Sequence, residues 1–394
     1  MSVDSPLPEP DPEALKVSQR LVRQIQEESN AGGGWLSFRR YMELALYAPG
    51  LGYYAAGSPK LGRGGDFVTA PEVSPVFGEC LARQCAQVLQ ALGGGSILEF
   101  GAGSGRLALD MLRALDALGG LPEAYAILEP SPDLRQRQES ALAELPPHLR
   151  HRVHWRDRLP DPGGFRGVML GNEVLDAMPV EVFRWDGARV QERGVCMGER
   201  GLEWAERPAG EALADRVAAL RAELGNAWPP DYVSEWNPGL GPWMRALGAS
   251  LEQGVVLLLD YGYPRPEYYS AERRRGTLIA HYRHRALEDP LAWPGLMDIT
   301  ANVDFTAVAE AGRDTGLRLL GYTSQAWFLM GAGLESVLAS RSSEDPAEQA
   351  SLAAQVRMLT LPSEMGERFQ VMALGRGVSV PLDGFTGRDL SRRL

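Results

Sequence analysis

From residue 95 onward, short apolar runs alternate with stretches that have the apolar spacing of helices. The run "SILEF" ends in glycines and precedes a helical pattern, "RLALDMLRALDAL", and "AYAILEPS" precedes a second one, "DLRQRQESALAEL". A weak strand, "HRVHW", and a strong one, "GVMLGNEV", follow. Strands that alternate with helices of this length predict βαβ units and a parallel sheet, hence an α/β fold.

The chain before and after this pattern does not show the same alternation of strands and helices. Before it, we expect a disordered tail, helices over 12–30 and from Phe38 to Leu46, a glycine-rich loop and a helix over 75–92. After Pro179, "VEVFRWDG", "RVQERGVCMG" and "LEWAER" predict a hairpin insertion. Further on we expect helices near 210–224, 238–252 and 304–315, a buried strand "GVVLLLDYGY", and last strands from "LRLLGYTSQAWFLMGAG" and "FQVMALGRG".

Composition limits the classes of function. With 51 acidic and 40 basic residues among 394, the chain lacks the basic surface typical of nucleic-acid binding. No apolar run is long enough for a membrane span, and the three cysteines are too scattered for a disulfide framework or a structural zinc site. The acidic, proline-rich N-terminus does not resemble a targeting signal, so we expect a cytoplasmic protein without nucleic-acid or membrane partners.

A glycine loop, "LEFGAGSGR", places Gly101, Gly103 and Gly105 between the first strand and its helix. Glycines let a ligand approach the backbone closely, and a helix N-terminus offers free N–H groups. The spacing is G-x-G-x-G with Arg106 next, which differs from a dinucleotide fingerprint.

Three carboxylates follow the first three strands of this pattern. Glu129 could accept hydrogen bonds from both hydroxyls of a ribose, Glu99 could receive an ammonium group, and Asp157 could accept from an adenine amino group. The alternative is that Glu99 and Glu129 only cap the next helices. Such acidic residues would repel a pyrophosphate but suit a sulfonium, so S-adenosylmethionine is favoured over a nicotinamide dinucleotide.

The motifs "ILEFGAGSGRLA" and "ILEPSP" resemble those of class I S-adenosylmethionine-dependent methyltransferases. More narrowly, "YMELALYAPGLGYYAAG", "GDFVTAPEVSPVFGECLA", "GNEVLDAMPVEVF", "LLLDYGY", "GTLIAHYRHRA" and "DITANVDFTAV" resemble the MidA-like family, whose mitochondrial members are protein arginine methyltransferases that act in assembly of respiratory complex I. The resemblance extends from about residue 35 to 375.

The resemblance implies a Rossmann-like sheet of seven strands, mostly parallel with a final antiparallel strand, and an arginine-containing protein substrate, with a complex I subunit as one candidate. We accordingly expect a tail and first helix over 1–30, a helical region covering the site over 31–94, a methyltransferase domain over 95–376 and a tail over 377–394. Insertions in the domain are expected at about 180–253 and 263–303.

The segment "GNEVLDAMP" follows a buried strand and presents two carboxylates. Glu173 could grip a guanidinium in a bidentate fork, Asp176 could share the grip or accept a proton, and Asn172 could fix the cofactor or the target. The alternative is that Asn172 caps a helix with an acidic first turn. The segment lacks the Asn/Asp-Pro-Pro-aromatic motif of enzymes that methylate adenine or glutamine.

Two other functions remain open at this level: methylation of a small molecule or another side chain, and a non-catalytic assembly chaperone. The loop "GDFVTAPEVS" offers Asp66, Thr69, Glu72 and Ser74, which we expect to close over the cofactor. A plain turn is the alternative.

Overall fold

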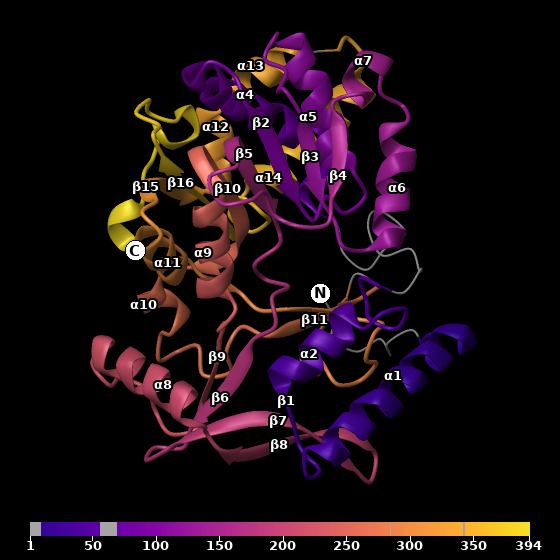
Figure 1. Cartoon of the computed structure of the whole chain (residues 1–394), viewed down its shortest axis with the longest axis vertical. Coiled ribbons are helices and arrows are strands. Elements are labelled where there is room, and N and C mark those ends of the chain that lie inside the picture. Colours follow the sequence, from indigo (N-terminus) through magenta and orange to yellow (C-terminus); the bar gives the residue numbers. More distant parts are fainter. Residues whose placement is uncertain (1–8, 56–68, 284, 342) are drawn as a thin grey trace. The chain divides into compact units, whose positions relative to one another are not determined.

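The computed structural model describes residues 9–55, 69–283, 285–341 and 343–394 (Figure 1). The chain divides into two compact units. One consists of Thr69–Asp176, Gly239–Tyr268 and Asn302–Leu394, and we call it the parallel-sheet unit. The other consists of Met1–Val68, Ala177–Pro238 and Tyr269–Ala301, and we call it the antiparallel unit.

The parallel-sheet unit is built on one mixed sheet with the strand order β15-β16-β10-β5-β2-β3-β4, and β14 pairs with β10. The strands from β10 to β4 are mutually parallel, whereas β16 is antiparallel to both of its neighbours. The expected α/β sheet with a final antiparallel strand is therefore confirmed. The strands are β2 Ser96–Phe100, β3 Tyr125–Leu128, β4 Val153–Arg156, β5 Phe165–Asn172, β10 Leu251–Tyr263, β14 Val303–Asp304, β15 Arg318–Ser324 and β16 Phe369–Arg376.

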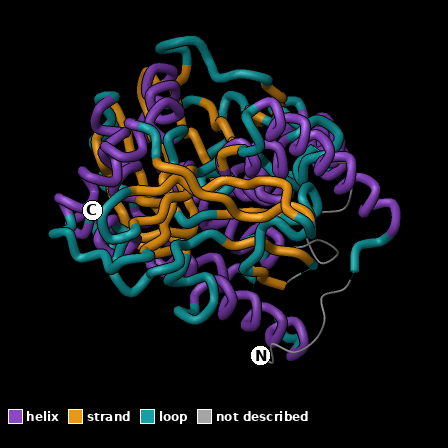
Figure 2. The backbone as a smooth tube through the Cα atoms, turned by 90° about the horizontal axis from the view of Figure 1, so that it is seen from below, coloured by secondary structure: helices purple, strands orange, loops and turns teal. Residues whose placement is uncertain are grey.

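Helices lie between most of these strands along the chain. Figure 2 distinguishes the two kinds of element by colour, with helices in purple and strands in orange. The apolar side chains of the strands pack with α4 and α5 into one core, which includes Ile97, Leu112 and Leu257. The helices are α3 Ala70–Val73, α4 Pro75–Leu92, α5 Arg106–Ala117, α6 Pro132–Leu142, α7 Pro147–Arg150, α9 Leu240–Ser250, α10 Arg265–Tyr268, α11 Phe305–Asp314, α12 Gln325–Gly331, α13 Leu334–Ser340 and α14 Pro346–Thr360. Short 3-10 turns follow at Asp383–Phe385 and Ser391–Arg393.

Helix α4 has the bounds that its sequence predicts. The Ser74 hydroxyl accepts the Val76 N–H, Pro75 occupies the first turn, and Gly93 ends the helix with a φ of 72°. The C-terminal region differs from the prediction, because the strand ends at Ser324 and Gln325–Gly331 is helical. The apolar run "AWFLM" is a buried helix, and a short apolar run by itself does not distinguish a strand from a buried helix.

The antiparallel unit contains a five-stranded sheet, in which β1-β7-β6-β9 is the order and β8 pairs with β7, and a three-stranded sheet β12-β11-β13. The expected hairpin strands are confirmed as β6, β7 and β8. The strands are β1 Leu36–Ser37, β6 Glu181–Trp185, β7 Val190–Gly198, β8 Gly201–Pro208, β9 Tyr232–Trp236, β11 Ile279–Tyr282, β12 Arg285–Leu287 and β13 Asp298–Thr300. The helices are α1 Pro12–Ala31, α2 Phe38–Tyr47 and α8 Glu211–Glu223.

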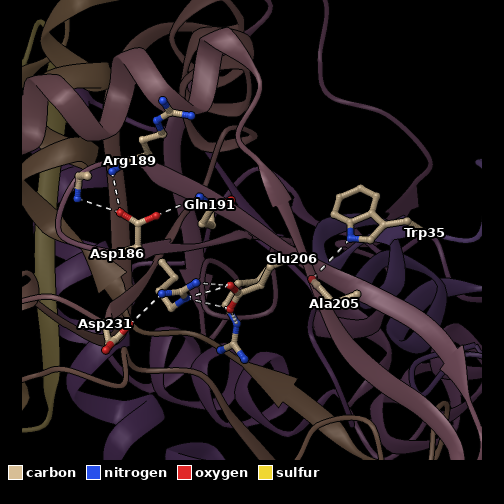
Figure 3. Close-up of polar contacts among 10 residues, drawn as sticks. Trp35, Asp186, Arg189, Gln191, Ala205, Glu206 and Asp231 are labelled. Atoms are coloured by element: carbon tan, nitrogen blue, oxygen red, sulfur yellow. Dashed lines mark hydrogen bonds and ion pairs between the residues drawn. The ribbon is translucent and has the colours of Figure 1, made fainter.

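Polar side chains fix the turn and the register of this hairpin (Figure 3). The Asp186 carboxylate accepts the backbone N–H groups of Ala188 and Arg189 in the turn, at 2.8 and 2.7 Å. Across the strands, the Arg184 guanidinium pairs with Glu206 and Asp231. In the part of the chain that the structure describes, no helix is long and apolar enough to cross a membrane.

Candidate functional site

The predicted site residues all belong to the parallel-sheet unit, where they lie in the last residues of β2 and β5 or in the segments that follow β2, β3, β4 and β5. Parallel strands end at the same edge of a sheet, and this edge is where open α/β folds bind ligands.

The glycine loop between β2 and α5 requires left-handed backbone at each of its three glycines. The φ angles of Gly101, Gly103 and Gly105 are 59°, 53° and 83°, which side chains with a Cβ atom rarely adopt. A Cβ at Gly105 would also lie 3.1 Å from the Cα of Gln138. The hydroxyl of Ser104 donates to the Glu72 carboxylate, so α3 is tied to this loop.

Glu99 lies in the interior of the unit, with only 2% of its surface exposed. The Tyr125 hydroxyl donates to its carboxylate at 2.8 Å. Burial raises the pKa of Glu99 to about 7, although the Tyr125 hydrogen bond acts in the opposite direction. Contact between this carboxylate and a cofactor ammonium stays a prediction.

Glu129 is also buried, and both of its carboxylate oxygens are held. Oε1 accepts the Ser131 N–H and Oε2 accepts the Gln138 amide, each at 3.0 Å. Burial raises the pKa of Glu129, and these hydrogen bonds partly offset the effect. A carboxylate offers about four acceptor positions, so each oxygen still has room for one more donor. Contact between this carboxylate and the two hydroxyls of a ribose stays a prediction.

Asp157 has a different environment from the other predicted carboxylates. Its side chain is 86% exposed, and Oδ1 accepts Nη2 of Arg135 at 2.6 Å. The same guanidinium nitrogen donates to the Glu129 carbonyl at 3.2 Å. Arg135 therefore links the ends of β3 and β4, and an adenine amino group would share Asp157 with this arginine.

The segment after β5 is not a helix. Val174, Leu175 and Asp176 donate their backbone N–H groups to one oxygen of Asp260, Oδ2, at 3.1, 2.8 and 3.3 Å. Glu173 has a φ of 53°, which is uncommon for a residue other than glycine, and strained backbone of this kind tends to cluster at functional sites. The alternative that Asn172 caps a helix is therefore wrong, because a carboxylate from β10 takes up the free N–H groups.

The amide of Asn172 lies at the end of β5, beside Glu173. Its Nδ2 donates to Oε1 of Glu173 at 3.1 Å, whereas its buried Oδ1 accepts no hydrogen bond within the described residues. Asp176 is buried as well. A Cβ at Gly101 would lie 3.9 Å from the Val174 side chain. The glycine loop and residues 173–176, which we call the acidic segment, are therefore neighbours.

Two contributors to the site had no clear signal in the sequence. Asp260 lies near the end of a buried apolar strand with nothing local to mark its role, and Gln138 lies on α6 without any motif. Of the loop expected to close over the cofactor, Glu72 contacts Ser104 and Ser74 caps α4, while Asp66 lies outside the described residues. No cluster of three metal-ligating side chains occurs in the described ranges.

Comparison with known proteins agrees with this geometry. Residues 80–323 match a family model described as "Putative S-adenosyl-L-methionine-dependent methyltransferase". The chain is 45% identical to a Burkholderia thailandensis protein solved bound to S-adenosyl-homocysteine, with a TM-score of 0.92 and coverage of 99% of this chain and 100% of that one.

Curated relatives extend the likeness over most of the chain. "Protein arginine methyltransferase NDUFAF7, mitochondrial" of Danio rerio is 30% identical, covering 91% of this chain and 87% of its own length. Its Drosophila melanogaster homologue is 29% identical, covering 94% and 89%. Both are named as mitochondrial proteins, so the cytoplasmic location expected from the N-terminus is contradicted and is not retained.

Proposed function

The chain belongs to this family of S-adenosyl-L-methionine-dependent methyltransferases, and from that membership we propose that it methylates arginine side chains of a protein. It is an enzyme, and its cofactor is S-adenosylmethionine. When bound, the cofactor supplies an electrophilic methyl group on a sulfonium. We propose below which residues hold this cofactor and which group accepts the methyl.

The residues at the sheet edge fit such a cofactor. The glycines let a ligand approach the backbone, and their G-x-G-x-G spacing with Arg106 next differs from a dinucleotide fingerprint. In our proposal Glu129 accepts the two ribose hydroxyls on its remaining acceptor positions, and Asp157 accepts from the adenine amino group. Glu99 receives the ammonium end, whose positive charge would favour the ionised carboxylate, and Asn172 offers a buried oxygen, Oδ1, to a donor.

The fixed acidic segment beside the glycine loop is the observation that supports an arginine acceptor. Asp260 binds the N–H groups of the three residues that follow Glu173, which itself has a left-handed conformation. Val174, the next residue, lies beside the loop that contains Gly101. A guanidinium is planar and charged, and a carboxylate can bind two of its N–H groups in parallel. In our proposal Glu173 provides this grip.

The transfer itself needs orientation and the removal of one proton. The new bond joins a guanidinium nitrogen to the methyl carbon as the bond from carbon to sulfur breaks, and that nitrogen releases one proton. In our proposal Glu173 aims the nitrogen and Asp176 accepts the proton or shares the grip. The third carboxylate, Asp260, keeps the segment in place and does not contact the substrate.

The names of the relatives support a protein substrate, since both are called protein arginine methyltransferases. A subunit of respiratory complex I is the more specific partner that the family resemblance suggests. An acidic chain, with a formal net charge of -11, is electrostatically suited to an arginine-rich segment.

The test is to incubate the purified chain with isotopically labelled S-adenosylmethionine and an extract of cells that lack the enzyme. Protein hydrolysates are then analysed by mass spectrometry. The proposal predicts labelled methyl-arginine, and none with Gly103→Val, whose β-branched side chain cannot adopt the left-handed backbone. Label in lysine or in small molecules, with none in arginine, would overturn the arginine proposal, as would the absence of any transfer.

A further inference from the structure

Gln138 lies on α6 and is fully buried. Its side-chain amide makes three hydrogen bonds at the edge of the sheet where the parallel strands have their carboxyl ends. Nε2 donates to the Gly103 carbonyl at 3.1 Å and to Oε2 of Glu129 at 3.0 Å. Oε1 accepts the indole N–H of Trp155, on β4, at 2.9 Å. One amide therefore connects the glycine loop, the Glu129 carboxylate that we propose binds the ribose, and strand β4.

The chemistry of the partners fixes the orientation of this amide. An indole N–H can only donate, so the Gln138 oxygen has to face Trp155. The amide nitrogen then faces a carbonyl and a carboxylate, which can only accept. Each polar atom of the side chain has a matching partner, and a rotated amide would place like groups against each other at all three contacts.

We infer that Gln138 is a positioning residue that aims the Glu129 carboxylate at the ribose, and that it thereby sets the preference of the site for a cofactor with an intact ribose diol. This inference rests on the proposed role of Glu129. Its physical basis is that each Glu129 oxygen already accepts one hydrogen bond, Oε2 from Gln138 and Oε1 from Ser131. One acceptor position is then left on each oxygen. With both oxygens held, the free positions point in fixed directions.

The hydrogen bond to Gly103 gives Gln138 a second effect, on the glycine loop. That effect does not depend on ribose hydroxyls, so it changes the affinity for any ligand of the loop by the same factor. The contact with Glu129 affects only ligands that carry the diol. A comparison of two ligands therefore separates the two effects.

The experiment measures, by calorimetry, the binding of S-adenosylhomocysteine and of its 2′-deoxyribose analogue to the full chain. In Gln138→Glu a second carboxylate replaces the amide, so that an acceptor faces Glu129 and Gly103. We expect the affinity for S-adenosylhomocysteine to fall about tenfold or more, through both effects together, and the preference over the deoxy analogue to fall by the part of that factor that comes from Glu129. Gln136→Glu, the same change at an exposed position of α6, should leave both ligands within about twofold of the original chain.

Two further variants make the outcome decisive. Glu129→Gln tests the proposed ribose ligand directly and should remove the preference. If Glu129→Gln keeps the preference, the proposed role of Glu129 fails. If Glu129→Gln removes it while Gln138→Glu keeps it within about twofold, the ribose assignment stands and the inference about Gln138 is overturned.

The second variant, Gln138→Met, has a side chain of similar length that makes none of the three hydrogen bonds and carries no charge. It should reduce the preference less than Gln138→Glu does. If Gln138 had a purely structural role, its variants would lower the unfolding temperature without changing the preference.

Discussion

The carboxylate of Asp260 accepts the backbone N–H of Leu175 at 2.8 Å, although 85 residues separate them in the chain. The same oxygen accepts the N–H groups on either side. Successive N–H groups that converge on one anion form a nest, an arrangement that usually binds a ligand or a phosphate. Here the anion comes from the protein, so the nest fixes the acidic segment after β5.

Replacing Asp260 by alanine should loosen this segment. Three N–H groups, two of them buried, lose their acceptor, and each buried donor left unpaired costs about 1–3 kcal/mol, so the free energy of unfolding is expected to fall by on the order of 3 kcal/mol or more. Methyl transfer should fall at least tenfold, because Glu173 is no longer fixed. Urea unfolding and a transfer assay check both effects, and Glu252→Ala, at an exposed position of the same strand, is the control. Unchanged transfer in Asp260→Ala would contradict the positioning role.

Gly105→Ala should weaken cofactor binding by about tenfold. The new Cβ needs left-handed backbone and lies 3.1 Å from Gln138, so the start of α5 has to shift. Gly119→Ala is the matched control, since Gly119 follows the same helix with a φ of 65° and its Cβ would meet nothing within 4 Å. Both variants should lose stability, but only Gly105→Ala should lose affinity for S-adenosylhomocysteine. Equal affinity in the two variants would show that the loop does not approach the ligand.

The buried Glu99 should make stability depend on pH. Its pKa is about 7 in the folded chain, against 4.5 for an ordinary glutamate, because burial disfavours the charged form. The folded state therefore binds the proton more tightly, and the stabilisation it gains below about pH 4.5 is lost as the pH rises through 7.

Glu99→Gln removes this titration. The free energy of unfolding of the variant, minus that of the original chain, should rise between pH 4.5 and 8 by on the order of 3 kcal/mol. Tyr125→Phe removes the hydrogen bond that lowers the pKa of Glu99, so stability should decline more steeply with pH in that variant. Urea titrations across this range provide the measurement. A difference between Glu99→Gln and the original chain that is constant with pH would refute the raised pKa.

The strands and most of the helices could be predicted from the sequence because their signals are local. The Ser74-Pro75 start and the Gly93 end of α4 lie within the helix or next to it. The strands β2, β3 and β5 are short apolar runs followed by glycine or polar residues. The helix α14, Pro346–Thr360, was not predicted, because only Leu359 in it is buried and its apolar residues form no clear stripe.

The conformation after β5 could not be predicted, because its determinant is distant in the sequence. Asn172 followed by acidic residues has the local pattern of a helix start, and only the pairing of β5 with β10 brings Asp260 to the free N–H groups. The same applies to Gln138, whose three partners lie on the glycine loop, after β3 and on β4. Sheet topology, and not local propensity, assembles these contacts.

The most direct test of the account is a paired measurement on Glu173→Gln, with methyl transfer to arginine and affinity for S-adenosylhomocysteine determined on the same preparation. The amide keeps the shape of the side chain but cannot bind a guanidinium as a charged fork. We predict that transfer falls by about a hundredfold or more while the dissociation constant changes by less than about threefold. A variant that still methylates arginine at a rate close to that of the original chain would contradict the assignment of Glu173 as the residue that grips the substrate.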